Sequence, residues 1–310
     1  MAKQKKLEYG FANKAWQVVT GCDNTISCWR ACWAKRTVAR LAGSPNAKTA
    51  AAHVGLVQMS GPTKEILTWT GDVRINEAHL NDPLKWRKAA IIATGFHGDW
   101  GLLSDADKDR MFAVMAQCPQ HTFFPLMKHR VYGMSEYLAC RADFRFRGPL
   151  PNVNIGVSVM TQADATAALP HVRAIAAMGW KTHCWHEPAI GLIDWTGWEF
   201  LTWLVVGGQS AGTEPFDVQW ARNAIAWGRA NGVPVKIKQL GSLPVIAACR
   251  QNHFDWGEDI RKGHVTRFSD YAPELWRINL KDHRGSNPSE WPEDLRVRQM
   301  PEAQGARKSK

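Results

Sequence analysis

Seven short runs of apolar and β-branched residues recur along the chain, and their alternation with helix signals constrains the fold more than any other feature. The runs are AWQVVT (15–20), AAIIATGF (89–96), HTFFPLM (121–127), NVNIGVSVM (152–160), WKTHCWH (180–186), TWLVVGG (202–208) and VPVKIKQ (233–239). Several of them are almost continuously apolar, as expected of strands that are buried on both faces. They predict strands of one parallel sheet.

Helix signals stand between several of these runs. They are the capping pairs Ser104/Asp107 and Thr161/Asp164, a helical pattern from Ser27 to Gly43, and a helix end at Asn231-Gly232. Strands that alternate with helices form βα units and hence an α/β fold. Six or seven such units in roughly 240 residues favour a TIM-type (β/α) barrel, complete or partial, over an open Rossmann sheet.

The alternation stops near residue 245, and this divides the chain in two. We predict a βα barrel over 1–245, with a cysteine loop at 22–32, and a polar C-terminal extension over 246–310 that packs on the barrel. No G-x-G-x-x-G follows the first run, and the glycines at 207–212 lack the G-K-[ST] ending of a Walker loop. An enzyme that binds nucleotide phosphates is therefore not indicated.

The charge of the chain is basic but unevenly distributed. Thirty-nine Lys and Arg against 28 Asp and Glu give a formal charge of +11, the sign expected of a protein that meets a polyanion. Six of these cations lie in two short tails that lack acidic residues, which leaves +5 for the body of the chain. The tail cations are Lys3, Lys5, Lys6, Arg307, Lys308 and Lys310.

Targeting signals and the number of cysteines bear on the cellular compartment. The charged start is not followed by the apolar stretch of a secretory signal, and no run approaches the ~20 apolar residues of a membrane helix. The chain has seven cysteines, an odd number that argues against a disulfide framework. We expect a cytoplasmic protein with no membrane partner.

Three cysteines fall within eleven residues after the first run. Cys22, Cys28 and Cys32 form C-x5-C-x3-C, and the spacing of the last two predicts two thiols one turn apart on the first helix. Loops at the carboxyl ends of barrel strands hold the active sites of this architecture. Three thiolates can hold a [4Fe-4S] cluster with one open iron. Zinc closed by a distant histidine such as His53, or unligated thiols, fit the spacing as well.

Ordered matches along the chain resemble a phage-associated, three-cysteine, radical-SAM-like family of phage proteins of formerly unknown function. The stretch WQVVTGCDNTISCWRACWA (16–34) is similar to its opening W-x-P-x-T-G-C … C-x-x-C-Y-A. Further matches are PLKWRKAAIIATGFHGDW (83–100), DRMFAVMAQCPQHTFFPLMKHR (109–130), PNVNIGVSVMTQ (151–162), HEPAIGLID (186–194), WLVVGGQSAGTEPF (203–216), GVPVKIKQLG (232–241) and WPEDLRVRQMP (291–301).

The resemblance implies a [4Fe-4S] cluster on Cys22, Cys28 and Cys32, with S-adenosylmethionine on the open iron and a 5′-deoxyadenosyl radical as the product of its reductive cleavage. It also implies an external electron donor of the flavodoxin or ferredoxin type and, for a phage-encoded protein, the host cytoplasm. The sequence departs from the family twice. The last spacing is three residues instead of two, and Trp33 replaces tyrosine as the aromatic cofactor contact.

Polar residues at strand ends are the other candidates for the site. Glu187 is the strongest, because a carboxylate at a strand end is costly to bury without a function; we assign it and Lys128 catalytic roles. The candidate cofactor contacts are Asp99, Ser158, Gly207, Gly208, Gln209, Ser210 and Lys238, with Gln239 in the same position as Lys238. The alternatives are a turn cap for Asp99, a solvated Lys128 and a backbone-bonded Ser158. Cys118, Cys140, Cys184 and Cys249 are interpreted as structural.

The leading hypothesis for function is a radical S-adenosylmethionine enzyme of the isomerase, mutase or transferase type. Its expected substrate is a hypermodified thymine or other pyrimidine in phage DNA, which has to leave the base stack to be reached. Tryptophans near basic residues in the extension, such as Trp256 and Trp276, are candidates for stacking on unpaired bases. The alternatives are a zinc-containing nucleic-acid-binding protein without catalysis and a radical enzyme that acts on tRNA or protein.

Overall fold

The computed structural model describes residues 10–24, 32–128, 131–141, 148–247, 258, 261–269 and 272–301. Cys28, Ser27, Cys249, Trp256 and the six basic tail residues therefore lie outside the described residues. The chain divides into two compact units. The first is formed by the residues up to Val157 with Ala174–Lys181, and the second by Ser158–Arg173 with the residues from Thr182 to Glu302.

All seven apolar runs contain a strand of one seven-stranded sheet, which confirms the α/β prediction. The strands are β1 (Lys14–Trp16), β6 (Ile91–Thr94), β8 (Thr122–Met127), β9 (Asn154–Val159), β10 (Lys181–His186), β11 (Trp203–Gly207) and β13 (Val235–Gln239). Their order is β1-β6-β8-β9-β10-β11-β13, and the pairs β1–β6, β6–β8, β8–β9, β10–β11 and β11–β13 are parallel. The order is open, with β1 and β13 as its ends. The fold is consistent with a partial TIM-type barrel and not with a complete one.

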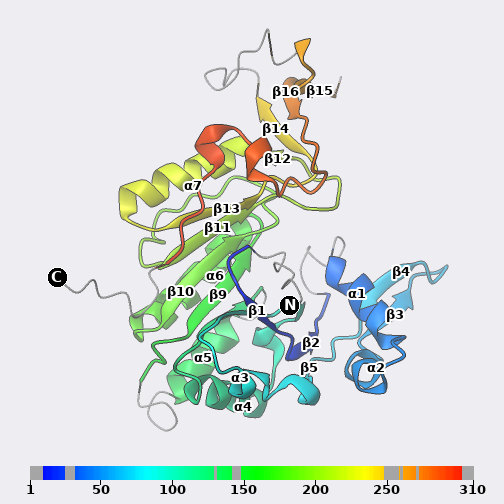
Figure 1. The fold of residues 1–310 in the computed structure, drawn as a ribbon, viewed down its shortest axis with the longest axis vertical. Helices are drawn as coiled ribbons and strands as arrows, with labels where there is room; N and C mark the ends of the chain where they lie inside the picture. Colours follow the sequence, from blue (N-terminus) through cyan, green and yellow to red (C-terminus); the bar gives the residue numbers. More distant parts are fainter. Residues whose placement is uncertain are drawn as a thin grey trace. The chain divides into compact units, whose positions relative to one another are not determined.

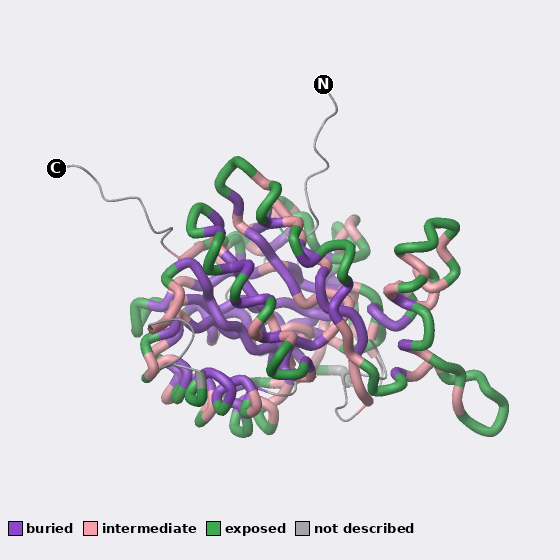
Figure 2. Tube along the Cα trace, turned by 90° about the horizontal axis from the view of Figure 1, so that it is seen from below, coloured by how far each residue is buried: buried purple, intermediate pink, exposed green. Residues whose placement is uncertain are grey.

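The core of the first unit is aromatic. Trp16, Trp100, Phe112 and Phe123 are each at most 1% exposed, and Trp16 contacts both Trp100 and Phe123 edge-on. The helical elements of this part are η2 (Glu77–His79), α3 (Asp82–Lys85), η3 (Trp100–Leu102), α4 (Asp105–Ala116) and α5 (Val131–Arg141). Buried stretches of the trace are concentrated in the strands, and the helices alternate between buried and exposed residues (Figure 2).

A lobe of short elements follows β1 in the first unit. Its elements are β2 (Val19–Gly21), α1 (Trp33–Ala42), α2 (Ala47–His53), the hairpin β3 (Val57–Ser60) and β4 (Ile66–Trp69), β5 (Arg74–Ile75) and β7 (His97–Gly98). β2 pairs with β5 and β7 in a separate three-stranded sheet. The prediction of one continuous first strand over 15–20 is therefore wrong: only its first part joins the main sheet. In Figure 1, α1, α2, β3 and β4 lie together beside β2.

The predicted helix ends are confirmed where they can be compared. The Ser104 Oγ accepts a hydrogen bond from the Asp107 backbone N–H and donates one to its carboxylate, at 3.1 and 3.0 Å. At the start of α6 (Gln162–Ala177), the Asp164 N–H donates to the Thr161 Oγ1, and the Thr161 N–H donates to the Asp164 carboxylate. α7 (Val218–Asn231) ends at Gly232, whose φ of 68° is left-handed. α1 ends at Gly43 as expected.

In the second unit, α7 covers one face of β11 and β13. A Cβ added to Gly228 of α7 would lie 2.3 Å from the Val235 side chain, so Val235 faces the helix. Alternate residues of a strand point to opposite faces. Lys236 and Lys238 therefore face away from α7, on the other face of the sheet.

Strands of the C-terminal extension join strands from earlier in the chain in a second sheet, which the sequence did not predict. β12 (Phe216–Asp217), β14 (Pro244–Ala247), β16 (Ala272–Ile278) and β15 (Val265–Ser269) form a four-stranded sheet in that order. Short helices η5 (Pro288–Glu290) and η6 (Glu293–Leu295) follow. The Ile237 N–H donates to Val297 O and the Gln299 N–H to Val235 O, so the extension pairs with the outer edge of β13. The division at residue 245 itself stays a prediction.

Among the described residues, none of the helices has the length and apolar character needed to cross a bilayer.

Candidate functional site

Cys22 and Cys32 lie in the same region of the first unit. Cys22 follows Gly21, the last residue of β2, and Cys32 precedes α1. Both are partly buried cysteines that pack against the same apolar cluster of Ala34, Val38, Leu56 and Trp69. The two ends of the cysteine loop thus meet on one apolar surface, although nine residues lie between them. The third cysteine of the motif, Cys28, lies outside the described residues.

The predicted one-turn relation between Cys28 and Cys32 involves a residue outside the described ones, and α1 itself begins after Cys32. Cys32 is the N-cap of this helix, and its backbone is extended, with φ −68° and ψ 110°. Its side chain makes no capping hydrogen bond. Lys35 of α1 is buried, and its Nζ donates to Leu67 O at 2.8 Å. The cysteine at this helix end is therefore not needed as a cap.

Two histidines and Trp33 adjoin the cysteine segment. The His97 ring lies 5.9 Å from that of His53 and 6.0 Å from that of Trp33, between ring centroids. Burial, followed by the positive charges of His53 and Arg40, lowers the pKa of His97 to about 4. The His53 Nδ1 lies 2.7 Å from the Thr49 carbonyl, which only accepts, so Nδ1 donates. The buried His53 Nε2 has no hydrogen-bond partner among the described residues.

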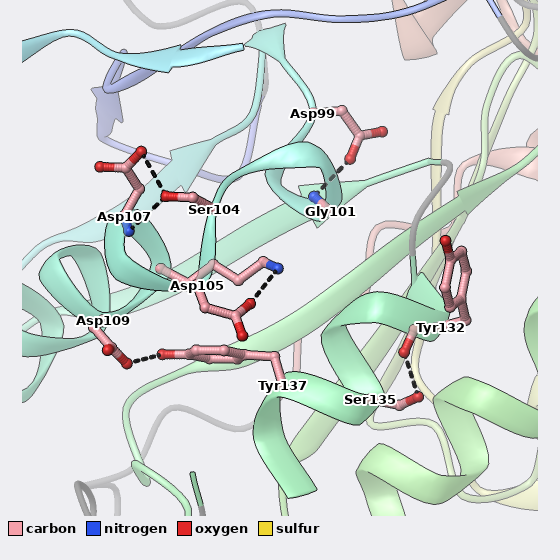
Figure 3. Close-up of polar contacts among 10 residues, drawn as sticks. Asp99, Gly101, Ser104, Asp105, Asp107, Asp109, Tyr132, Ser135 and Tyr137 are labelled. Atoms are coloured by element: carbon pink, nitrogen blue, oxygen red, sulfur yellow. Dashed lines mark hydrogen bonds and ion pairs between the residues drawn. The ribbon is translucent and has the colours of Figure 1, made fainter. Parts of the chain in front are cut away.

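Asp99 is a structural anchor in this unit. One carboxylate oxygen accepts from the Gly101 N–H at 2.8 Å, and the other accepts from the Lys128 N–H at 2.7 Å. The first of these bonds, with the helix cap and the paired side chains of α4 and α5, is drawn in Figure 3. These bonds agree with the alternative in which Asp99 caps a turn. Lys128 directly follows β8, is partly exposed, and is tied to Asp99 through its backbone.

Glu187 is the centre of a polar cluster in the second unit. It directly follows β10, and its Oε1 accepts from Lys238 Nζ at 2.5 Å and from Gln239 Nε2 at 2.9 Å. The Lys238 and Glu187 side chains are only 18% and 13% exposed. The Lys238 ammonium also lies 5.3 Å from the centroid of the Trp185 ring. Three predicted strand-end residues, Glu187, Lys238 and Gln239, thereby lie together. Glu187 and Lys238 form a nearly buried ion pair beside the Trp185 ring.

The other candidate cofactor contacts of the second unit make mainly backbone contacts. The Ser158 hydroxyl donates to Glu187 O at 2.9 Å, as in its backbone-bonded alternative. A Cβ on Gly207 would lie 3.5 Å from Glu187 Oε1. A Cβ on Gly208 would lie 2.6 Å from Leu240 O, so the chain itself occupies the space that was expected for a ligand. Gln209 is buried and accepts from the Glu214 N–H at 3.4 Å, and Ser210 is partly exposed.

Lys236 was not among the residues predicted from the sequence. Its side chain is 2% exposed, and burial, with the charges of Arg298 and Lys238, lowers its pKa to about 8. It lies on the same face of β13 as Lys238. The alternation in VPVKIKQ is the signal that would have found it, because Lys236 and Lys238 are two positions apart in a strand.

The other described cysteines show different environments. Burial raises the pKa of the Cys184 thiol far above its ordinary range and also raises that of Cys118, so both behave as small apolar residues. Cys140 is exposed. Among the described residues, no group of three His, Cys, Asp or Glu side chains is arranged to hold a metal ion.

The comparison with protein families gives one match. The model of a family described as "Protein of unknown function (DUF5131)" matches residues 6–287. The chain belongs to this family. No curated protein and no solved structure matches it. The matched span of this DUF5131 protein includes the cysteine segment, the Glu187 cluster and the strands β14 to β16.

His186, next to Glu187 in this DUF5131 protein, makes stability depend on pH. Burial lowers its pKa from 6.5 to about 4. Below pH 6.5 the unfolded chain takes up a proton that the folded chain does not accept until about pH 4. Stability is therefore lost as the pH falls through this window, by about 3 kcal/mol for this group. Urea unfolding at pH 7 and 4.5 measures it.

We expect His186→Asn to lose less stability between these pH values than the wild type. His264→Asn is the control, because His264 is exposed. Equal losses in the wild type and His186→Asn would show that this histidine does not cause the acid sensitivity.

Proposed function

We propose that this protein is a radical S-adenosylmethionine enzyme that modifies a nucleic-acid base. One observation carries the proposal: Cys22 and Cys32, the two ends of the C-x5-C-x3-C motif, pack on the same apolar cluster at the carboxyl end of β2. The resemblance of the motif and of the ordered segments after it supplies the reaction class.

The residues present fit an iron–sulfur cluster in their donor chemistry. Both described cysteines are partly buried, whereas Cys184 is fully buried in the core. The apolar surface beside them limits solvent access, one of the factors that set the potential of a cluster. Cys22, Cys28 and Cys32 are the proposed ligands. When bound, such a cluster supplies the electron that cleaves S-adenosylmethionine to methionine and a 5′-deoxyadenosyl radical, which abstracts a hydrogen atom from the substrate.

The Glu187 cluster has the polar groups to bind and orient an amino-acid moiety. Lys238 is held by Glu187, whose second oxygen Oε2 takes part in neither of the bonds to Lys238 and Gln239. A nearly buried carboxylate and ammonium pair can bind the amino and carboxylate groups of an amino-acid moiety through charge-assisted hydrogen bonds. Such a moiety occurs in S-adenosylmethionine and in an amino-acid adduct of a pyrimidine. We assign Glu187 and Lys238 this binding role, and Lys128 the binding of a substrate anion.

The substrate we propose is a hypermodified thymine or other pyrimidine in DNA, with isomerisation or group transfer as the outcome. The net charge of +11 is the physical support for a polyanionic substrate. An external flavodoxin- or ferredoxin-type protein would deliver the electron.

Anaerobic purification followed by iron, sulfide and zinc analysis tests this function. We expect about four irons per chain, a brown chromophore, and 5′-deoxyadenosine after addition of dithionite and S-adenosylmethionine. Stoichiometric zinc without this product would contradict the proposal and favour the zinc-containing nucleic-acid-binding alternative. Nucleoside analysis of DNA and tRNA incubated with the enzyme then identifies the modified base.

A further inference from the structure

The lobe around the cysteine site carries an uninterrupted series of positive charges. Between Asp23 and Glu65 the sequence has no acidic residue, whereas it has six basic ones: Arg30, Lys35, Arg36, Arg40, Lys48 and Lys64. Arg30 lies outside the described residues, and Lys35 is buried by its bond to Leu67 O. The other four side chains are exposed.

Helix α1 presents two of these cations and an aromatic ring along one stripe. Trp33, Arg36 and Arg40 are spaced three and four residues apart, which places them on the same helix face. All three are exposed, and Trp33 is 52% exposed. The opposite face of α1 buries Ala34 and Val38 against Leu56 and Trp69. The orientation of the stripe is thus set by the packing of the helix.

The charges of this lobe are not neutralised within the protein. Among the described residues, Arg36, Arg40, Lys48 and Lys64 form no ion pair. Elsewhere in the same unit, Arg110 pairs with Glu77 and Asp107, and Lys85 pairs with Asp82. α1 has no acidic residue in its sequence WAKRTVARLA. Cations that are left exposed and close together attract a polyanion, and binding releases its counterions.

The stripe begins at the cysteine site. Trp33 directly follows Cys32, and its ring contacts His97 edge-on while half of its surface stays exposed. An exposed indole next to guanidinium groups is a platform on which an unpaired base stacks, whereas the bases of a duplex are already stacked on one another. The feature therefore favours a single strand.

We propose that the exposed stripe of α1, formed by Trp33, Arg36 and Arg40, binds single-stranded or locally unpaired nucleic acid. The two guanidinium groups contact successive phosphates, and one base stacks on the Trp33 ring. A strand held in this way passes next to the cysteine site. This last step rests on the proposed function, whereas binding to the stripe does not.

Fluorescence anisotropy of the full-length, iron-loaded protein with a fluorescein-labelled oligothymidine and with a labelled duplex tests the stripe. Arg36→Gln/Arg40→Gln is expected to weaken single-strand binding about tenfold at low salt. The double variant is also expected to flatten the dependence of log K on log salt by about 1.4, the value for two phosphate contacts. Trp33→Leu is expected to weaken binding about tenfold, and Trp33→Phe, which keeps a flat ring, to retain most of the affinity.

The matched control is Arg87→Gln/Lys88→Gln, which removes two other exposed cations of the same unit. Its affinity should stay within about twofold of the wild type, since these residues lie outside the stripe. If both double variants weakened single-strand binding equally, the loss would reflect only the total charge of the protein. This result would overturn the proposal. Wild-type affinity in Trp33→Leu, or tighter binding of the duplex than of the single strand, would overturn it as well.

Metal content and 5′-deoxyadenosine formation, measured on the same preparations, separate this inference from the proposed function. A wild-type protein that contains zinc and cleaves no S-adenosylmethionine contradicts the enzyme function and leaves the binding result standing. An iron-loaded wild type that cleaves S-adenosylmethionine but binds the oligonucleotide no better than the Arg36→Gln/Arg40→Gln variant contradicts only the stripe.

Discussion

Cys32→Ala is expected to lower the iron content from about four per chain to below one and to abolish the formation of 5′-deoxyadenosine. A cluster that loses one of its three thiolate ligands is not retained. The folded structure should survive the change, because the Cys32 side chain makes no capping hydrogen bond to α1 and the backbone geometry of an N-cap is open to alanine. The measurements are iron and sulfide analysis, thermal unfolding of the metal-free form, and product formation under dithionite.

Cys140→Ser is the matched control, because Cys140 is exposed and lies outside the motif. It should keep the iron and the activity of the wild type. Full iron content and activity in Cys32→Ala would exclude Cys32 as a ligand and, with it, the three-cysteine site. Cys28→Ala extends the test to the cysteine that the structure does not describe.

Glu187→Gln is expected to reduce the rate of product formation by about 100-fold, the cost typical of a misoriented reactant. The amide keeps the shape of the side chain but removes the charge that holds the Lys238 ammonium at 2.5 Å. Lys238 is then a nearly buried cation without its carboxylate partner, and such groups are costly. Affinity for S-adenosylmethionine, from equilibrium dialysis, should fall together with the rate.

A double variant tests whether Glu187 and Lys238 act together. If they act as one unit, the Glu187→Gln/Lys238→Met variant should be no slower than the slower single variant. Effects that multiply would show that the two residues act independently and would contradict the assigned pair. Glu293→Gln is the control, since Glu293 is an exposed carboxylate on η6 in the same unit.

The fold was predictable where local pattern and tertiary environment agree. The runs at 121–127, 152–160 and 180–186 became β8, β9 and β10 with boundaries shifted by at most two residues. Their apolar and β-branched content suits strands buried on both faces. The first run was not predictable as two strands, because β2 leaves the main sheet only to pair with β5 and β7, which come much later in the chain.

The candidate site shows the same division. Glu187 and Lys238, chosen separately as strand-end residues, form one ion pair because β10 and β13 both pair with β11. Asp99 is equally polar and equally placed after a strand, but two backbone N–H groups occupy its carboxylate. No property of the sequence distinguishes these two carboxylates. Lys236 was overlooked because its burial depends on the neighbouring strand and on the residues near Arg298.

The sequence by itself determined the class of the fold, the helix ends and the presence of three closely spaced cysteines, because periodicity, capping and spacing are local properties. Only the tertiary structure decided that Cys22 and Cys32 share one apolar surface, that Glu187 holds Lys238, and that Arg36 and Arg40 lie on an exposed face with Trp33. These relations depend on contacts between residues far apart in the chain or on which helix face is buried, and side-chain packing settles both.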